Sequence, residues 1–120
     1  MLADLAGGSA PIRNTLRTLM WDHVGILRDA AGLAQARAAL GASYTAHPVA
    51  GLEASETANL ALVGWVMAEA ALRREESRGA HYRLDFPRPR PAWRRRQLFV
   101  VRPRGTRNVT AGRAGAEMAA

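Results

Sequence analysis

Three side chains in the second half of the chain have the types found in hydrolytic active sites. Ser77, His81 and Asp85 follow one another at intervals of four residues. Such a set can supply a nucleophile, its general base and the group that orients the base. Side chains four residues apart align only on a continuous helix, and Gly79 interrupts the helix predicted here. No segment signals an oxyanion hole, so the sequence argues against a catalytic triad.

The other polar residues form no catalytic or metal-binding pattern. His23, His47 and His81 share no metal-ligand spacing, and His23 falls on an apolar helix face, where a structural histidine is expected. Adjacent Glu75 and Glu76 near a helix C-terminus are unfavourable for the helix dipole. We expect them to pair with arginines of the same segment, namely Arg73, Arg74 or Arg78. No glycine-rich phosphate loop follows a strand, so we predict no catalytic, cofactor-binding or metal-binding residue.

The composition indicates a cytoplasmic protein. The 120 residues include no cysteine, which excludes disulfides, a thiolate metal site and a cysteine nucleophile, and fits a reducing compartment. No signal peptide is visible. The longest apolar run, residues 59–72, is interrupted by Glu69 and is shorter than the ~20 residues that span a bilayer. We therefore expect no membrane partner.

Positive charge is concentrated towards the C-terminus. All 17 basic residues are arginines, and residues 80–120 hold ten of them against two acids, a net charge of +8. Such a segment could bind nucleic acid through its phosphates. Few aromatic residues stand beside the arginines for base stacking, and a lysine-free composition rich in Ala and Arg indicates a coding bias. We therefore do not favour nucleic acid as the partner.

Apolar periodicity predicts three helices, the first two in the N-terminal half. The first begins at Pro11, which suits the first helical turn, and ends at Gly32. Its apolar face comprises Ile12, Leu16, Leu19, Met20, His23, Ile26 and Leu27. The second is Ala-rich and ends near Ala46. Its apolar face comprises Leu33, Ala36, Leu40 and Tyr44.

The third helix is predicted from Ser55, as its N-cap, to Arg78, with Gly79 as its stop. Its apolar residues point in several directions. Leu60, Val63, Met67 and Ala70 share one face, while other faces carry Leu62, Trp65, Val66 and Leu72. A helix that is apolar on several sides usually packs on several sides. Because two partner helices do not easily cover this much surface, part of it is expected to be an interface.

The chain after the third helix is predicted to be extended and then partly disordered. Residues 80–87 alternate in character and end at a proline, whereas residues 88–120 are rich in Arg and Pro. This divides the chain into a loose lead-in (1–10), a helical bundle with its extended segment (11–87) and the tail. The expected fold is all-α, a spectrin-repeat-like three-helix bundle followed by an extended, partly disordered C-terminal tail.

Two stretches resemble the C-terminal helical domain of the succinate dehydrogenase and fumarate reductase flavoprotein family. They are LRTLMWDHVGILRDAAGLAQARAAL (16–40) and ETANLALVGWVMAEAALRREESRGAHYRLDFP (56–87). The run ESRGAHYRLDFP is typical of the broad family, and LMWDHVGILR is most similar to L-aspartate oxidase. After DFP the chain departs from the family, because arginines surround Trp93 where a more acidic stretch is expected.

The resemblance implies a parent enzyme that oxidises L-aspartate to iminoaspartate by hydride transfer to FAD. The product would pass to quinolinate synthase for NAD biosynthesis. In the family, the flavin and the catalytic residues belong to a flavin-binding domain and a capping domain that precede the bundle, and none can be assigned to a position here. The chain alone is therefore expected to be inactive, as a fragment, a truncated gene product or one part of a split enzyme.

The extended segment 80–87 is expected to dock on the flavin-binding and capping domains of that parent. Arg78, His81, Tyr82 and Arg83 carry more hydrogen-bond donors than an exposed segment needs, and extended backbone needs partners as well. Two other functions stay open. One is the same domain in a succinate dehydrogenase or fumarate reductase flavoprotein, and the other is an independent helical module that binds nucleic acid through its Arg-rich tail.

Overall fold

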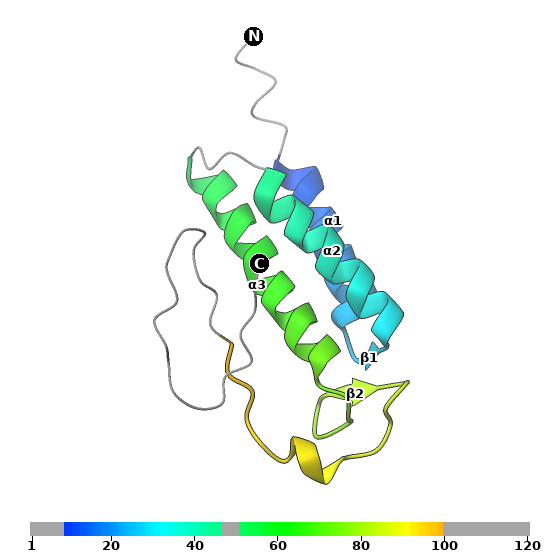
Figure 1. The fold of residues 1–120 in the computed structure, drawn as a ribbon. Helices are drawn as coiled ribbons and strands as arrows, with labels where there is room; N and C mark the ends of the chain where they lie inside the picture. Colours follow the sequence, from blue (N-terminus) through cyan, green and yellow to red (C-terminus); the bar gives the residue numbers. More distant parts are fainter. Residues whose placement is uncertain (1–8, 47–50, 100–120) are drawn as a thin grey trace.

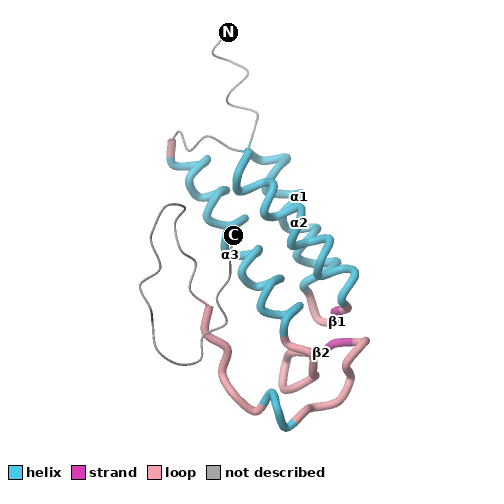
Figure 2. Tube along the Cα trace, viewed as in Figure 1, coloured by secondary structure: helices cyan, strands magenta, loops and turns pink. Residues whose placement is uncertain are grey.

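The computed structural model describes residues 9–46 and 51–99, and its main elements are three α-helices that lie side by side (Figure 1). They are α1 (Ser9–Val24), α2 (Ala30–Ala46) and α3 (Leu52–Arg73). The shorter elements are β1 (Leu27–Arg28), β2 (Tyr82–Arg83) and the 3-10 helix η1 (Pro91–Trp93) (Figure 2). The predicted all-α three-helix bundle is confirmed. None of the described helices is long and apolar enough to cross a bilayer.

The core forms where large side chains of α1 and α2 meet small ones of α3. Its buried members are Leu16, Val24, Leu33, Ala36, Leu40, Ala61, Ala68 and Ala71. Gly64 of α3 belongs to the same contact, because a Cβ there would lie 3.1 Å from the Met20 sulfur and 3.2 Å from a Leu40 methyl carbon. The small residues let α3 approach its partners closely. The predicted core face of α2 is confirmed for Leu33, Ala36 and Leu40, whereas Tyr44 is exposed.

The prediction of the first helix is wrong at its C-terminal end. Helix α1 ends at Val24 rather than at Gly32. Ile26 and Leu27, which the periodicity assigned to the core face, follow this end and are exposed. Their side chains therefore belong to the surface of the domain.

The break between α1 and α2 is set by an N-cap that the periodicity does not reveal. Asp29 Oδ1 accepts a hydrogen bond from Gly32 N at 2.7 Å, and the Asp29 carbonyl accepts one from Leu33 N at 3.0 Å. An aspartate in this position pairs the free amides of a helix start. A new helix therefore begins at Ala30, within the range predicted as one continuous helix.

The third helix begins and ends earlier than predicted. Its N-cap is Gly51, at φ +88°, and Ser55 lies inside the helix, where its hydroxyl donates to Gly51 O at 2.9 Å. The helix ends at Arg73, not at Arg78. Gly79 is therefore not a helix stop but lies in a later turn at φ +59°, a conformation that suits glycine.

Helix α3 carries more apolar surface than the bundle covers, as the sequence predicted. Leu60, Val63 and Met67 lie along one exposed face, while Trp65 and Leu72 pack partly against the core. Whether the exposed face is an interface stays a prediction.

The chain after residue 87 returns to the end of α3. Arg74 donates to Trp93 O at 2.7 Å and to Arg95 O at 3.1 Å, so this part of the predicted tail is held against the bundle. The disorder predicted for the remainder of the tail falls on residues 100–120, outside the described residues. Residues 1–8 of the predicted lead-in also lie outside them.

The core assignment predicts a difference between two leucines. Leu40 is 0% exposed and Leu60 is 51% exposed. We expect Leu40→Ala to lower the free energy of unfolding by about 2–5 kcal/mol, because it leaves a cavity, and Leu60→Ala to lower it by less than about 1 kcal/mol. Urea unfolding followed by circular dichroism measures both values. Equal losses in the free energy of unfolding for the two variants would show that Leu40 is not a core residue.

Candidate functional site

The functional candidate is the end of the bundle at which α1 ends, α2 begins and α3 ends (Figure 1). The last carbonyls and the first amides of a helix have no partner within the helix. Residues 74–90, which we call the clamp segment, pass this end after leaving α3. Together with β1 they supply hydrogen-bond partners to all three helix ends.

The strands β1 and β2 hold the clamp segment in register. They pair in parallel, with Leu27 opposite Tyr82 and Arg28 opposite Arg83, and Leu84 N donates to Arg28 O at 2.7 Å. Successive side chains of a strand point to opposite faces. The two paired arginines turn inward to the helix ends, which places Leu27 and Tyr82 on the outer face.

Arg83 closes the C-terminus of α3. Its guanidinium donates to Ala71 O and Leu72 O, both at 2.8 Å, and to the two oxygens of Asp85 at 2.7 and 2.6 Å. A cation at this position also meets the negative end of the helix dipole. Arg83 is only 1% exposed, and these bonds pair the charge that burial would otherwise make costly.

Asp85 connects Arg83 to the start of α2. Its Oδ2 atom accepts a hydrogen bond from Ala30 N at 3.1 Å, across 55 positions of sequence. The hydrogen bonds from Arg83 hold the pKa of the Asp85 carboxyl below its usual value. Asp85 is therefore ionised at neutral pH, as suits a group at the positive end of a helix dipole.

Arg28 and His81 act together at the C-terminus of α1. Arg28 Nε donates to Val24 O at 3.1 Å and to Gly25 O at 2.8 Å, and Arg28 Nη1 lies 2.9 Å from His81 Nδ1. His81 Nε2 lies 3.1 Å from Arg74 O. A guanidinium only donates, so Nδ1 accepts, and the ring proton is on Nε2, where it is donated to the carbonyl. Burial, followed by the charges of the nearby arginines, lowers the pKa of His81.

Glu76 is a second buried charge of the clamp segment, at 0% exposure. It accepts two hydrogen bonds from Arg78 at 3.1 Å, one from Arg90 N at 2.8 Å and one from Arg74. These bonds, those from Arg78 foremost, lower its pKa to about 2. The predicted pairing with arginines is confirmed for Glu76, while Glu75 lies 3.5 Å from Arg90, a partner that was not predicted.

Ser77 holds the turn between these charged groups. Its hydroxyl accepts from Arg83 N at 2.8 Å and donates to Phe86 O at 2.8 Å. Ser77 and Asp85, whose types with His81 suggest a hydrolytic triad, instead both bind Arg83, and His81 binds Arg28 and Arg74. Among the described residues, no group of three or more potential ligands could hold a metal ion.

The four predicted docking residues differ in how they lie. Arg83 is buried and His81 is half-buried, and the donors of both have partners inside the chain. Arg78 and Tyr82 are exposed. Sequence reasoning treated all four alike because the partners of His81 and Arg83 lie in other elements. Docking of this segment on another domain stays a prediction. Of the four residues, Arg78 and Tyr82 are the ones exposed on the surface, where they could contact such a domain.

Sequence reasoning also missed Arg28, whose side chain closes α1 and contacts His81. A signal for it does exist in the sequence. Basic side chains just beyond a helix C-terminus often bind the last carbonyls. That rule would have identified Arg28 only if the end of α1 at Val24 had been known.

The role of Arg83 predicts a large loss of stability when its charge is removed. In Arg83→Met, Asp85 and two carbonyls of α3 lose their donors, so we expect the free energy of unfolding to fall by at least about 2 kcal/mol. Arg17→Met, at an exposed position of α1, is the matched control and should change it by about 0.5 kcal/mol or less. Thermal and urea unfolding measure both losses. Equal losses in the free energy of unfolding for Arg83→Met and Arg17→Met would contradict this role of Arg83.

The neutral state of His81 predicts a pH dependence. The pKa of His81 is lower in the folded chain than its ordinary value of about 6.5 in the unfolded chain. The unfolded state thus binds the proton more readily, and stability should be full above pH ~6.5 and fall as the pH drops below it. His81→Gln keeps one acceptor and one donor but does not titrate. Urea unfolding between pH ~5 and ~8 should show the fall in the free energy of unfolding in the wild type and not in the variant. Identical pH profiles for the two would show that His81 does not cause the pH dependence.

Comparison with known proteins gives the chain its relatives. A family model described as fumarate reductase flavoprotein C-term matches residues 13–113. A fumarate reductase (CoM/CoB) subunit of Methanothermobacter marburgensis is 36% identical over 110 residues, covering 82% of this chain and 20% of that protein. L-aspartate oxidase of Pyrococcus abyssi is 37% identical over 86 residues, covering 72% of this chain and 16% of that protein. No solved structure matches.

The match includes both halves of the site. Residues 13–113 contain β1 and the whole clamp segment. L-aspartate oxidase of Pseudomonas aeruginosa, 43% identical over 79 residues, covers 60% of this chain and 14% of its own length. The chain thus spans a fifth or less of the length of these relatives. Since the family model covers most of the sequence, the chain belongs to the C-terminal domain family of the fumarate reductase flavoproteins.

Proposed function

We propose that this chain forms the C-terminal helical domain of an FAD-dependent enzyme that oxidises L-aspartate to iminoaspartate, a step of NAD biosynthesis. The observation that carries the proposal is its similarity to several proteins named L-aspartate oxidase. The enzymes from Mesorhizobium japonicum and Pseudomonas aeruginosa are 42% and 43% identical over 82 and 79 residues. This agrees with the resemblance of the run LMWDHVGILR to the same enzymes.

In this proposal the chain contributes structure, and other parts of the flavoprotein bind the flavin. A flavin dinucleotide needs free amides or cations for its phosphates. The buried arginine of the clamp segment, Arg83, is bound to Asp85 and to helix carbonyls. Among the described residues no buried side-chain nitrogen or oxygen lacks a hydrogen-bond partner. We therefore assign the flavin to other parts of the flavoprotein and assign no catalytic step to the described residues.

We further propose that the clamp segment docks on the flavin-binding and capping domains. Tyr82 and Arg78 are the exposed members of the predicted docking set. His81 and Arg83, which flank Tyr82, hold it in place through bonds to Arg74 O and to the end of α3. They act as positioning residues behind the contact. No relative's name points to quinolinate synthase, so contact with that enzyme is not part of the proposal.

A second candidate is the same domain in a succinate- or fumarate-converting flavoprotein. The observation that favours it is the match to the fumarate reductase subunit of Methanothermobacter marburgensis, which covers 82% of this chain, against 72% for the Pyrococcus abyssi oxidase. All arginines of the Arg-rich tail lie inside the range of the family model, so nucleic-acid binding has no separate support.

The proposal predicts that activity appears only with the flavin-binding part. The chain alone should retain no FAD through gel filtration and form no peroxide from L-aspartate. Mixed with the Pyrococcus abyssi oxidase from which the matched segment has been removed, it should form a complex whose yellow flavin is bleached by L-aspartate. FAD retained by the chain alone would overturn the structural role. A complex only with the correspondingly shortened fumarate reductase subunit would favour the second candidate.

A further inference from the structure

The outer side of β1 and the last turns of α1 expose an unusual group of apolar side chains. Trp21 and Ile26 are 79% and 78% exposed. Leu27, Tyr82 and Leu84 are also among the exposed large apolar residues. We call these five residues the strand-face patch. Single exposed apolar residues are common on proteins, but a contiguous cluster marks an interaction site.

The strand-face patch is exposed because the arginines of β1 and of the clamp segment bind the helix ends. Arg28 and Arg83 must point inward to close α1 and α3. Since Leu27 and Tyr82 pair one position earlier in the same two strands, their side chains lie on the opposite, outer face. Leu84, which follows β2 and whose amide donates to Arg28 O, is 52% exposed. The contacts that stabilise the bundle therefore fix apolar side chains on its surface.

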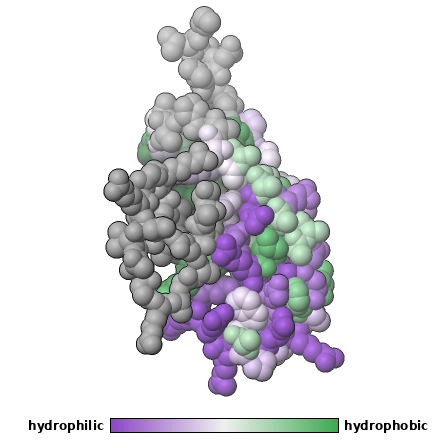
Figure 3. Space-filling model, in the orientation of Figure 1, coloured by the Kyte–Doolittle hydropathy of each residue, from purple (hydrophilic) through white to green (hydrophobic). Residues whose placement is uncertain are grey.

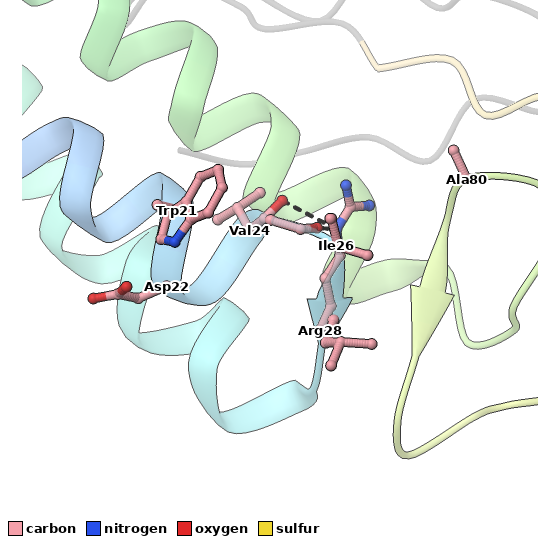
Figure 4. Close-up of a pocket in the computed structure, with 8 residues that line it drawn as sticks. Trp21, Asp22, Val24, Ile26, Arg28 and Ala80 are labelled. Carbon is pink, nitrogen blue, oxygen red and sulfur yellow. Dashed lines mark hydrogen bonds between the residues drawn. The ribbon is translucent and has the colours of Figure 1, made fainter.

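A hollow beside the strands adjoins three residues of the patch, Trp21, Ile26 and Leu27. It is lined by residues of the end of α1, by β1 and by Ala80 of the clamp segment, with a volume of about 580 Å³. Figure 4 shows Trp21 and Asp22 on α1, Ile26 just before β1, and Ala80 in the turn that precedes β2. Arg28, which also lines the hollow, donates from Nε to Val24 O (Figure 4). Figure 3 shows apolar side chains in green among purple hydrophilic ones at this end of the molecule.

Trp21 has the properties of an interface anchor. Tryptophan is among the residues that contribute most to binding when buried in a partner's pocket. Its neighbours on the strands are held by backbone pairing, by the buried Arg83 and by the half-buried Arg28, so little conformational freedom is lost when a partner binds. Asp22, exposed beside it at the rim of the hollow, would face a cation or a hydrogen-bond donor of the partner.

We infer that the strand-face patch, with Trp21 as its anchor, is the surface by which this chain binds the flavin-binding part of the flavoprotein. This inference rests on the proposed function and moves the centre of the contact from the clamp segment to α1 and β1. Two observations favour this occupant. The matched segment is only 14–20% of the relatives' length, and the patch includes Tyr82, one of the two exposed residues of the predicted docking set. The partner surface is an apolar pocket bordered by a basic or donor group.

Calorimetric titration of the chain and its variants into the shortened Pyrococcus abyssi oxidase, which lacks the matched segment, tests this inference. Trp21→Ala and Ile26→Ala should each weaken binding at least about tenfold. Leu52→Ala, at the exposed first residue of α3 and at the other end of the bundle, is the matched control and should change the affinity less than about twofold. Leu60→Ala tests the exposed face of α3 as the rival contact. Because all four side chains are exposed, urea unfolding should give similar stabilities for the variants and the wild type.

Each alternative result would exclude a different statement. If the wild type binds and only Leu60→Ala weakens binding, the contact lies on α3 and the strand-face patch is wrong, while the proposed function stands. Sedimentation measures whether the chain instead associates with itself. If it does, and Trp21→Ala abolishes this self-association, a second copy of the chain covers the strand-face patch and the inference fails. If the wild type binds neither the shortened oxidase nor a second copy of itself, the inference and the proposed function both fail.

Discussion

The ion pair between the buried guanidinium of Arg83 and the partly exposed carboxylate of Asp85 is the contact on which the closed end of the bundle depends. Through it, one guanidinium binds the last carbonyls of α3 while its partner carboxylate binds the first amide of α2. Removing either charge would leave the other buried or poorly paired, which costs far more than an exposed pair contributes. Arg28 and His81 add the end of α1 to the same structure. The three helices are thus joined by polar contacts as well as by their apolar core.

This arrangement explains how a segment without regular helix can carry a function. A short extended stretch is usually mobile, because it has few buried contacts. Here the inward arginines and Ser77 fix the backbone, and the outward positions are left free for a partner. A small core built largely from alanine gives limited stability by burial alone, so the clamp contributes to the rigidity of the bundle and to the surface that it presents.

The sequence predicted those features that depend on local spacing. Leu33, Ala36 and Leu40 form a helical face that can be recognised without any tertiary information, and all three are buried. The break at Asp29 was missed because apolar residues continue across it at helical spacing, although Ile26 and Leu27 point to solvent. The roles of Arg83 and His81 were also hidden, since their partners include groups 11 to 53 positions away. The many hydrogen-bond donors of residues 78–83 marked the site, but not the direction in which each side chain points.

Hydrogen exchange of the native chain tests whether the clamp segment and the helices form one cooperative unit. The informative amides are Arg83 N, Leu84 N and Arg90 N, bound to Ser77 Oγ, Arg28 O and Glu76 Oε2. If the clamp holds the helix ends, these amides should exchange with the same free energy of opening as the core amides of α3. Exchange of the clamp amides through local opening, while α3 stays protected, would contradict the clamp's role and make the segment a peripheral loop.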